Sequence, residues 1–395
     1  MYSPLLTLLA VLLLLAAFMR GDFALSLVYL VVGAFVAGLW WGRRALTQVE
    51  TKRRFNTHAF LGEKVKINLR VQNKGWLPIP WLELRDVLPV ELAGPRNFQM
   101  ATNLESHADA NFEYSVEALK RGYYPIGPLS ISTGDILGLS KSLRAENQAE
   151  HLVVYPKIIP FTSIKIPSYS PQGTLQHALP LFEDPTRIFG KRGYAPGDSL
   201  RRIDWKSSAS MGRLQVRLFE PSIALETFVV LNLNAEDYFY RNRIDSSELA
   251  IVIAASVSNW IVGKQQMVGM MINGHDPLSA DSTPQSIPPG KGRLHLIRLL
   301  ETLARSATIE SSPLVPLIQR QRYQLAWGTT LIVITGTANS ELLDELYQAR
   351  RCGQNVVLIL AGRNPVEKDI DHHAKLFGIP VFSVVTEHDL EVWKQ

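Results

Sequence analysis

The sequence contains very little cysteine: Cys352 is the only one among 395 residues. A single cysteine excludes an intramolecular disulfide and any zinc site built from several cysteines. A large excess of one charge is also lacking, because 41 Lys and Arg stand against 36 Asp and Glu, a formal net charge of +5. Arg43, Arg44 and residues 52–54, less Glu50, supply +4 of it and leave +1 for the rest. This nearly neutral remainder argues against a nucleic-acid groove, which needs Lys and Arg spread over a binding face.

Two long hydrophobic runs open the chain, over residues 5–19 and 23–41, with only residues 20–22 between them. A bilayer core about 30 Å thick needs about 20 helical residues, so the second run is long enough and the first is slightly short. The short polar break favours a transmembrane helical hairpin over residues 1–42. The alternative is a secretory signal peptide followed by one anchor. Against it, residues 1–4 carry no positive side chain and no convincing cleavage site follows the first run.

The basic cluster comes directly after Trp40 and Trp41, where an aromatic belt is expected at the membrane surface. Loops rich in Lys and Arg stay in the cytoplasm. The sequence therefore predicts a multi-pass protein with two membrane helices and the bulk of the chain in the cytoplasm. Specific binding of acidic lipid is a second explanation for the same cluster.

The next segment, residues 43–155, has the pattern of short strands. Residues 64–71 alternate polar and apolar side chains, which is typical of a half-buried strand. Further strands are predicted over residues 81–87, 110–118, 129–132 and 151–155. Many short strands separated by turn signals predict an antiparallel β-sandwich. Nothing in this segment has a catalytic pattern.

Residues 156–224 form a connection whose first part, residues 156–186, contains many prolines and is predicted to be a linker. After it, opposite charges alternate around Ile203 and Trp205, and a strand is predicted over residues 214–219. One explanation is a structural salt-bridge cluster, with Asp198 available as a helix N-cap. The other makes Asp198 or Asp204 a general base or metal ligand, with arginines holding an anion. No histidine, serine elbow or glycine-rich phosphate loop accompanies them, which favours the structural explanation.

The last part of the chain, residues 225–395, alternates apolar strands with amphipathic helices. The predicted strands are residues 228–233, 267–272, 330–335, 356–360 and 381–385, and the predicted helices are residues 246–262, 293–305, 340–351 and 371–377. This order predicts an α/β domain with a mostly parallel, doubly wound sheet. Ligands bind such sheets at the carboxyl ends of the strands. Those ends are residues 232–234, 273–276, 335–337 and 361–363.

The middle of the chain contains a dense run of charged and aromatic residues. The hallmark residues are Arg192, Tyr194, Gly197, Asp198, Arg201, Arg202, Asp204, Trp205 and Lys206. They resemble the hallmark of the domain of unknown function 58 family, and the pattern Arg213-x-x-Val216-Arg217-x-Phe219-Glu220 extends the resemblance. The hallmark residues are candidates for an interaction surface.

The resemblance covers nearly the whole chain and implies that residues 225–395 form a von Willebrand factor A-like domain. Metal-binding domains of that type carry Asp-x-Ser-x-Ser after the first strand. This chain has Asn232, Asn234 and Glu236 at those positions. Loss of the leading carboxylate removes most of the charge that a divalent cation needs. No metal and no other cofactor is therefore expected, and Mg²⁺ bound through the amide oxygens is the alternative.

Family members are bacterial and are commonly encoded beside MoxR-type AAA+ ATPases. The resemblance thus implies a non-enzymatic inner-membrane adaptor or scaffold that works with such an ATPase in assembling or activating membrane and envelope complexes. Its expected docking surface is the carboxyl end of the sheet. Two other functions stay open: a divalent-metal-dependent ligand-binding module, and a membrane-bound hydrolase that uses Asp198 and Asp204.

Overall fold

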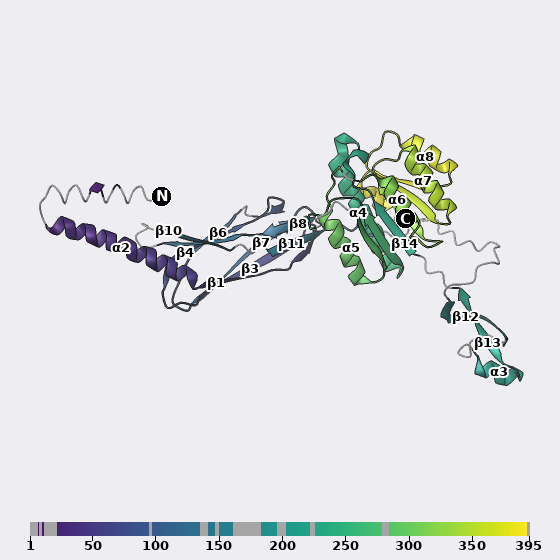
Figure 1. Cartoon of the computed structure of the whole chain (residues 1–395), viewed down its shortest axis with the longest axis horizontal. Helices are drawn as coiled ribbons and strands as arrows, with labels where there is room; N and C mark the ends of the chain where they lie inside the picture. Colours follow the sequence, from purple (N-terminus) through teal and green to yellow (C-terminus); the bar gives the residue numbers. More distant parts are fainter. Residues whose placement is uncertain are drawn as a thin grey trace. The chain divides into compact units, whose positions relative to one another are not determined.

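The computed structural model describes residues 7, 10–11, 22–94, 97–134, 141–146, 150–160, 183–195, 203–221, 226–278, 284–310 and 312–392. The chain divides into two compact units. The first comprises Met1–Lys157 with Leu300–Arg305, and the second comprises Ile158–Leu299 with Ser306–Gln395. The first contains an apolar helix and several β-sheets, and the second contains a mixed α/β sheet (Figure 1).

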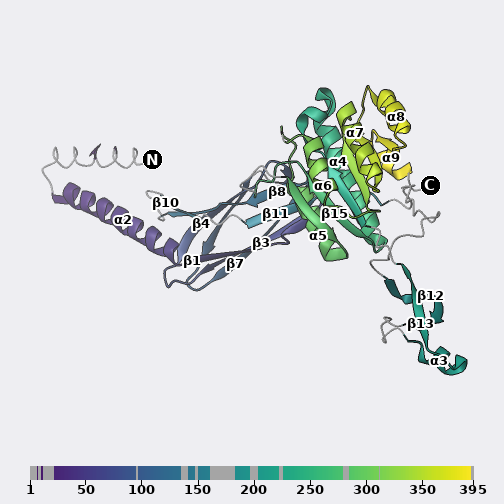
Figure 2. The ribbon, with the colours of Figure 1, turned by 45° about the vertical axis from the view of Figure 1, so that its right-hand side comes forward.

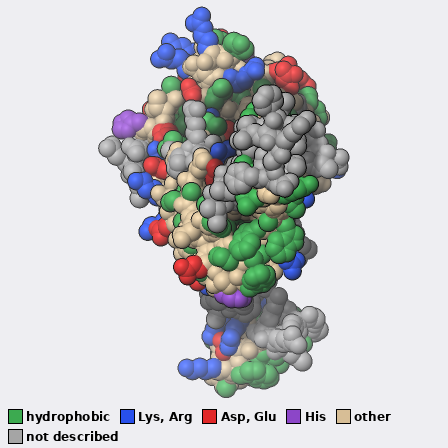
Figure 3. Space-filling view, turned by 90° about the vertical axis from the view of Figure 1, so that its left-hand side faces the viewer, with side chains coloured by type: hydrophobic (Ala, Val, Ile, Leu, Met, Phe, Trp, Pro, Cys, Tyr) green, Lys and Arg blue, Asp and Glu red, His purple; other side chains and the backbone are tan. Residues whose placement is uncertain are grey.

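The first unit begins with a long apolar helix, α2 (Asp22–Thr47). Two described segments are long and apolar enough to cross a bilayer, Ser26–Thr47 and Tyr240–Gly263. The second is mostly buried, as a core helix is, whereas α2 is mostly exposed. Exposed apolar side chains of α2 include Leu30 and Trp40, and hydrophobic groups gather on the face seen in Figure 3. An exposed apolar helix is thus present where the second membrane helix is predicted. The first predicted helix lies almost entirely outside the described residues.

Three sheets follow α2 in the same unit. The first contains, in sheet order, β1 (Val49–Arg54), β3 (Lys64–Asn73), β7 (Asp109–Ala118) and β5 (Leu92–Ala93). The second contains β10 (Lys141–Glu146), β9 (Leu129–Gly134), β4 (Ile79–Val87) and β6 (Asn97–Leu104). The third contains β2 (His58–Phe60), β11 (Glu150–Tyr155) and β8 (Gly122–Ile126). Neighbouring strands are antiparallel except β2 and β11, so the predicted antiparallel strands are confirmed, with one parallel pair added.

The two four-stranded sheets share one hydrophobic core. Val65, Ile67 and Leu69 on β3 are buried and alternate with exposed side chains, which is the periodicity that predicted this strand. Leu82 and Leu84 on β4 belong to the same buried cluster. Each fully buried Leu or Ile stabilises the fold by about 1.5–3 kcal/mol relative to an exposed one.

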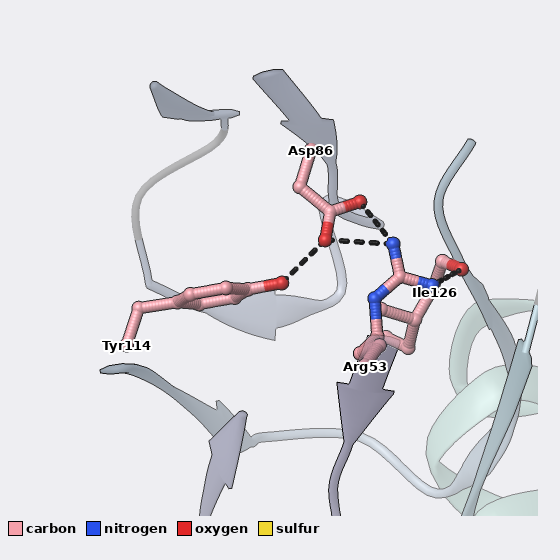
Figure 4. A network of polar contacts seen from close by, with 4 residues as sticks. All are labelled: Arg53, Asp86, Tyr114 and Ile126. Carbon is pink, nitrogen blue, oxygen red and sulfur yellow. Dashed lines mark hydrogen bonds and ion pairs between the residues drawn. The ribbon is translucent and has the colours of Figure 1, made fainter. Parts of the chain in front are cut away.

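An ion pair is buried inside this core (Figure 4). Arg53 on β1 donates from Nη2 to both carboxylate oxygens of Asp86 on β4, at 2.8 Å each, and from Nη1 to the Ile126 carbonyl at 3.1 Å. Tyr114 on β7 donates its hydroxyl to Asp86 Oδ2 at 2.5 Å. The side chains of Arg53 and Asp86 are only 5% and 0% exposed. Burial, followed by the hydrogen bond to Asp86, raises the pKa of Tyr114, so its hydroxyl stays protonated and donates at neutral pH.

The buried position of Arg53 corrects the predicted basic cluster. The sequence places Arg53 among the cations next to the membrane, and that is wrong, because Asp86 neutralises its guanidinium inside the sandwich. The exposed members of the stretch are Arg43, Arg44, Lys52 and Arg54. Four residues of this basic stretch therefore lie at the surface, and one, Arg53, lies in the core.

A β-hairpin with a short helix follows in the second unit. β12 (Glu183–Gly193) pairs antiparallel with β13 (Gln215–Pro221), and α3 (Trp205–Met211) lies between them in sequence. The predicted strand over residues 214–219 is confirmed as β13. The predicted linker over residues 156–186 is wrong at its end, because β12 already begins at Glu183. Residues 161–182 of that linker lie outside the described residues.

The second unit contains a six-stranded sheet. Its order is β16 (Gln285–Gly290), β15 (Met267–Ile272), β14 (Glu226–Leu231), β17 (Thr330–Thr335), β18 (Asn355–Ala361) and β19 (Val381–Val384). All neighbouring strands are parallel except β15 and β16. The predicted mostly parallel sheet is thus confirmed, with an antiparallel edge strand. The chain order reverses beside β14, and open α/β sheets bind ligands at such a point.

Helices lie on both sides of this sheet (Figure 2). They are α4 (Arg243–Gly263), α5 (Arg293–Arg305), α6 (Leu314–Arg322), α7 (Ser340–Arg351), α8 (Glu367–Leu376) and α9 (Glu387–Val392). Two short 3₁₀ helices, η2 (Ala235–Asp237) and η3 (Tyr240–Asn242), precede α4. Phe228 and Val230 on β14 pack in one core cluster with α6, α7 and α8. Val229 and Leu231 point to the other face, because successive strand residues alternate, and α4 packs along the sheet there.

Candidate functional site

The hallmark residues are only partly described. Gly197, Asp198, Arg201 and Arg202 lie outside the described residues. On the hairpin, Tyr194 donates its backbone N–H to the Leu214 carbonyl at 2.9 Å, and Arg192 donates from Nη1 to the Gly193 carbonyl at 3.2 Å. Trp205 and Lys206 begin α3, and both are exposed. Among the described hallmark residues, Asp204 is the buried acid.

Asp204 holds the hairpin together through both carboxylate oxygens. Oδ1 accepts the Ser207 N–H at 3.1 Å, which makes Asp204 the N-cap of α3. Oδ2 lies 2.8 Å from Lys191 Nζ on β12 and 3.6 Å from Arg217 Nε on β13. The hydrogen bond from Lys191, aided by the Ser207 N–H, lowers the pKa of the carboxyl below its usual value.

This geometry favours a structural role for Asp204. A general base needs a lone pair free to take a proton from substrate, and the Asp204 oxygens already bind a helix N-terminus and two cations. The lowered pKa also makes the carboxylate a weaker base. The N-cap of α3 is therefore Asp204, whereas the sequence offers Asp198 as an N-cap earlier in the segment.

We expect Asp204→Asn to loosen the hairpin at neutral pH and to have little effect in acid. Asn keeps the cap but loses both ion pairs. Because the pKa is lowered in the folded state, the carboxylate stabilises the fold above its unfolded pKa of about 3.9, and this contribution disappears as the pH falls through the folded pKa. Hydrogen exchange in α3 and β13 is expected to be faster in the variant at pH 7, with the ratio to wild type approaching one below about pH 4. Asp204→Ala, which also lacks the cap, is expected to exchange faster still, and equal exchange in all three proteins at pH 7 would refute the structural role.

A second polar cluster lies at the carboxyl end of the six-stranded sheet. We call it the amide network; its members are Asn232, Asn234, Asp237, Asn273 and Thr335. Asn232 follows β14, Asn273 follows β15 and Thr335 ends β17, so three adjacent strands bring them together. Asn232, Asn273 and Thr335 are buried. Residues from three of the four strand ends named from the sequence thus lie in contact.

Backbone N–H groups fix the orientation of the amides, because a backbone N–H can only donate. Asn232 Oδ1 accepts the Asn234 N–H at 3.0 Å, so its Nδ2 faces Asp237 Oδ2 at 2.8 Å and Thr335 Oγ1 at 2.9 Å. Asn273 Oδ1 accepts the Leu233 N–H at 2.5 Å, so its Nδ2 donates to Asn232 Oδ1 at 2.7 Å. Each amide thus determines the orientation of the next.

The carboxylate of this cluster comes from Asp237 rather than from the predicted Glu236. Glu236 is exposed, whereas Asp237 Oδ2 accepts N–H groups from both Asn232 and Asn234, the latter at 3.1 Å. From the sequence, Glu236 and Asp237 are a pair of acids at a helix start, and both do lie in η2; the contact of Asp237 with the amides depends on the fold. Within the described residues, no three His, Cys, Asp or Glu side chains come together as a metal site requires.

The amide network is suited to holding loops and poorly suited to holding a cation. A divalent cation needs oxygen lone pairs and negative charge, but the Asn232 oxygen already accepts two N–H groups and Asp237 Oδ2 accepts two more. The amide N–H groups point at the carboxylate, where a cation would have to bind. The residues present therefore do not fit a metal centre without rearrangement.

Large apolar side chains surround the same edge of the sheet. We call them the apolar rim: Phe239, Tyr240, Ile244, Leu278 and Val366. All five are exposed. They lie in the segments that follow β14, β15 and β18, and such segments meet at one edge of a parallel sheet. Exposed apolar groups gathered in this way mark interaction sites.

Comparison with known proteins agrees with the hallmark. Residues 190–330 match the family described as "Protein of unknown function DUF58". Over 320 residues the chain is 22% identical to "Uncharacterized protein YeaD" of Bacillus subtilis, covering 79% of this chain and 75% of that protein. These findings support the DUF58 family.

Two further comparisons are more limited. Over 114 residues the chain is 30% identical to "Uncharacterized protein Mb1516" of Mycobacterium bovis, which covers 29% of this chain and 34% of that protein. Among solved structures, proximal thread matrix protein 1 from the mussel byssus aligns with 44% of this chain and 46% of its own, at 11% identity and a TM-score of 0.31. A similarity that low carries no argument about fold or function.

Proposed function

We propose that this protein is a non-enzymatic adaptor of the bacterial inner membrane. It presents the carboxyl edge of its α/β sheet to a partner protein in the cytoplasm. The partner is a MoxR-type AAA+ ATPase, and the process served is assembly or activation of membrane and envelope complexes. The choice of partner rests on the family resemblance, and the choice of surface rests on the structure.

The α/β unit is a von Willebrand factor A-like domain in this proposal. The sheet order β16-β15-β14-β17-β18-β19, with β16 antiparallel at one edge, supports it. The amide network occupies the carboxyl end of β14, where the metal of such a domain would bind. In place of a metal, hydrogen bonds between side chains hold the loops.

The membrane anchor of the proposal is a two-helix hairpin whose second helix is α2. Its exposed apolar surface and its length support a membrane span. Arg43 and Arg44 follow the apolar part of α2 and are exposed, so the positive-inside rule puts the following domains in the cytoplasm.

The observation that carries the proposal is the apolar rim beside the amide network. An interface hot spot needs an exposed aromatic anchor on a rigid support. Tyr240 is 83% exposed, with the Arg243 guanidinium over its ring at 5.6 Å from the centroid. The amide network holds the segment that leads from β14 towards it. Rigid presentation reduces the entropy lost on binding.

We expect Tyr240→Ala to weaken binding to a trapped, ATP-bound MoxR-type ATPase about 30-fold, the effect of a hot spot of about 2 kcal/mol. Binding of the full chain in detergent micelles can be measured by light-scattering or interferometric titration. Tyr323→Ala is the matched control, because Tyr323 is 79% exposed and also lies under an arginine, Arg322. It precedes β17, at the opposite edge of the sheet. Equal losses in both variants, or no binding by the wild type, would contradict the proposal.

The two other functions receive less support. A metal-dependent module requires a cation where the amide N–H groups of Asn232 and Asn234 point. A hydrolase using Asp198 and Asp204 requires a free acid or base. Asp204 is held by Lys191 and Ser207, and Asp198 lies outside the described residues.

A further inference from the structure

Trp76 is an exposed aromatic side chain on a rigid loop between β3 and β4. Its residue is 64% exposed, while the next residue, Leu77, is fully buried. Asn73, also fully buried, donates from Nδ2 to the Leu77 carbonyl at 2.8 Å and accepts the Gly75 N–H on Oδ1 at 2.9 Å. Hydrogen bonds to the residues on both sides of Trp76 therefore fix the loop. The folded loop holds the indole at the surface.

This loop is tied to the last turns of α2. Trp41 donates its indole N–H to the Pro78 carbonyl at 3.0 Å, and Lys74 donates its backbone N–H to the Gln48 carbonyl at 3.0 Å. Pro78 and Lys74 are each two residues from Trp76, which is about 7 Å of chain at most. Trp76 therefore lies close to the level at which α2 passes from apolar residues to Arg43 and Arg44.

The join between α2 and the sandwich is also fixed. α2 ends at Thr47 and β1 begins at Val49, so a single residue separates them. Leu46 is buried in the sandwich core, and Arg144 on β10 donates from Nη1 to the Leu46 and Val49 carbonyls, both at 3.0 Å. Cationic side chains at the end of a helix stabilise its last carbonyls. The sandwich is thus held in one orientation relative to α2.

We propose that Trp76 inserts into the headgroup region of the anionic bilayer that α2 crosses. The sandwich then stands on the membrane on its Trp76 end. Trp prefers this region because its ring is apolar and its N–H is polar. Arg43 and Arg44, which follow Trp41 on α2 and are exposed, complement anionic phospholipid headgroups. This inference rests on the proposed membrane span of α2.

Depth-dependent fluorescence quenching tests the inference. The full chain with Cys352→Ser receives one new cysteine, by Trp76→Cys, Leu119→Cys or Leu30→Cys, and a small environment-sensitive dye. Leu119 is the matched control, because it is 56% exposed and follows β7 at the opposite end of the strand pair, about 30 Å away. Leu30 is on α2 and reports on the span itself. The proteins are reconstituted in vesicles of phosphatidylethanolamine and phosphatidylglycerol with nitroxide on the headgroup or deep in the acyl chain.

We expect headgroup nitroxide to quench the dye at position 76 several-fold more than at position 119, and acyl nitroxide to quench the dye at position 30 most. Equal quenching at positions 76 and 119, with position 30 still quenched, would overturn the inference and leave the span intact. No quenching at position 30 would refute the span and with it the inference. Equal protease resistance of the three variants excludes misfolding as the cause.

Discussion

Asp86→Ala is expected to destabilise the β-sandwich by about 3–5 kcal/mol, the effect of removing one partner of a buried ion pair. The substitution leaves the Arg53 guanidinium in the core without its counter-ion, and the Tyr114 hydroxyl without its acceptor. Desolvation of an unpaired charge costs more than the pair itself contributes. Native-state hydrogen exchange of β3 and β7 in the full chain, in detergent micelles, measures this loss locally.

Asp109→Ala is the matched control in the same sandwich. Asp109 Oδ2 lies 3.1 Å from Arg70 Nη2, but both side chains are about half exposed. Water screens such a pair, so the expected loss is below about 1 kcal/mol. The triple variant Arg53→Met, Asp86→Leu and Tyr114→Phe is expected to recover part of the stability lost in Asp86→Ala, because no buried polar group then lacks its partner. Equal effects of Asp86→Ala and Asp109→Ala would contradict the buried pair.

Asn232→Asp is expected to destabilise the α/β unit by about 3 kcal/mol. In the wild type, Asn232 Nδ2 donates to Asp237 Oδ2 at 2.8 Å and also to Thr335 Oγ1. In the variant a carboxylate oxygen replaces this donor, so it faces the Asp237 carboxylate and Thr335 loses its donor. Two carboxylates in a partly buried site repel each other, and each lost hydrogen bond to a buried group costs about 1–3 kcal/mol. Urea unfolding followed by exchange in β14 and β17 measures the change. Asn339→Asp makes the same exchange of amide for carboxylate at the N-cap of α7, where Asp is as good a cap as Asn, and little change is expected.

The same variant distinguishes the amide network from a metal site. Facing carboxylates are what a divalent cation binds, so added Mg²⁺ is expected to raise the unfolding midpoint of Asn232→Asp. The wild type is expected to respond neither to Mg²⁺ nor to a chelator. A midpoint that rises with Mg²⁺ in the wild type would instead favour the metal-dependent module.

Much of the α/β unit follows from sequence periodicity. Apolar strands such as Met267–Ile272 and Thr330–Thr335, and the amphipathic helix Ser340–Arg351, have the bounds that the pattern predicts. The sequence pattern did not predict β16 and α6, because both contain proline. Pro288 and Pro289 suit only an edge strand, and Pro316 lies in the first turn of its helix, where the missing N–H is harmless.

The sequence conceals features that depend on distant partners. β1 reads as a run of charges, and only Asp86, 33 residues away from Arg53, reveals that one of them is buried. The Asn232 and Asn234 positions were predictable from strand ends, whereas the inclusion of Asp237 depends on the turn at η2. The apolar rim was not predictable because its members are scattered along the sequence, and only the sheet order places the segments that carry them at one edge.

In-cell photo-cross-linking from Tyr240 tests the central claim most directly. A photoreactive amino acid replaces Tyr240 in the full chain, and in a parallel strain it replaces Tyr323 at the opposite edge of the sheet. Cross-linked proteins are identified by mass spectrometry in cells that carry a hydrolysis-deficient MoxR-type ATPase. The adaptor account predicts that the ATPase is recovered from position 240 and not from position 323. Recovery of envelope proteins alone from position 240, or equal recovery of the ATPase from both positions, would contradict it.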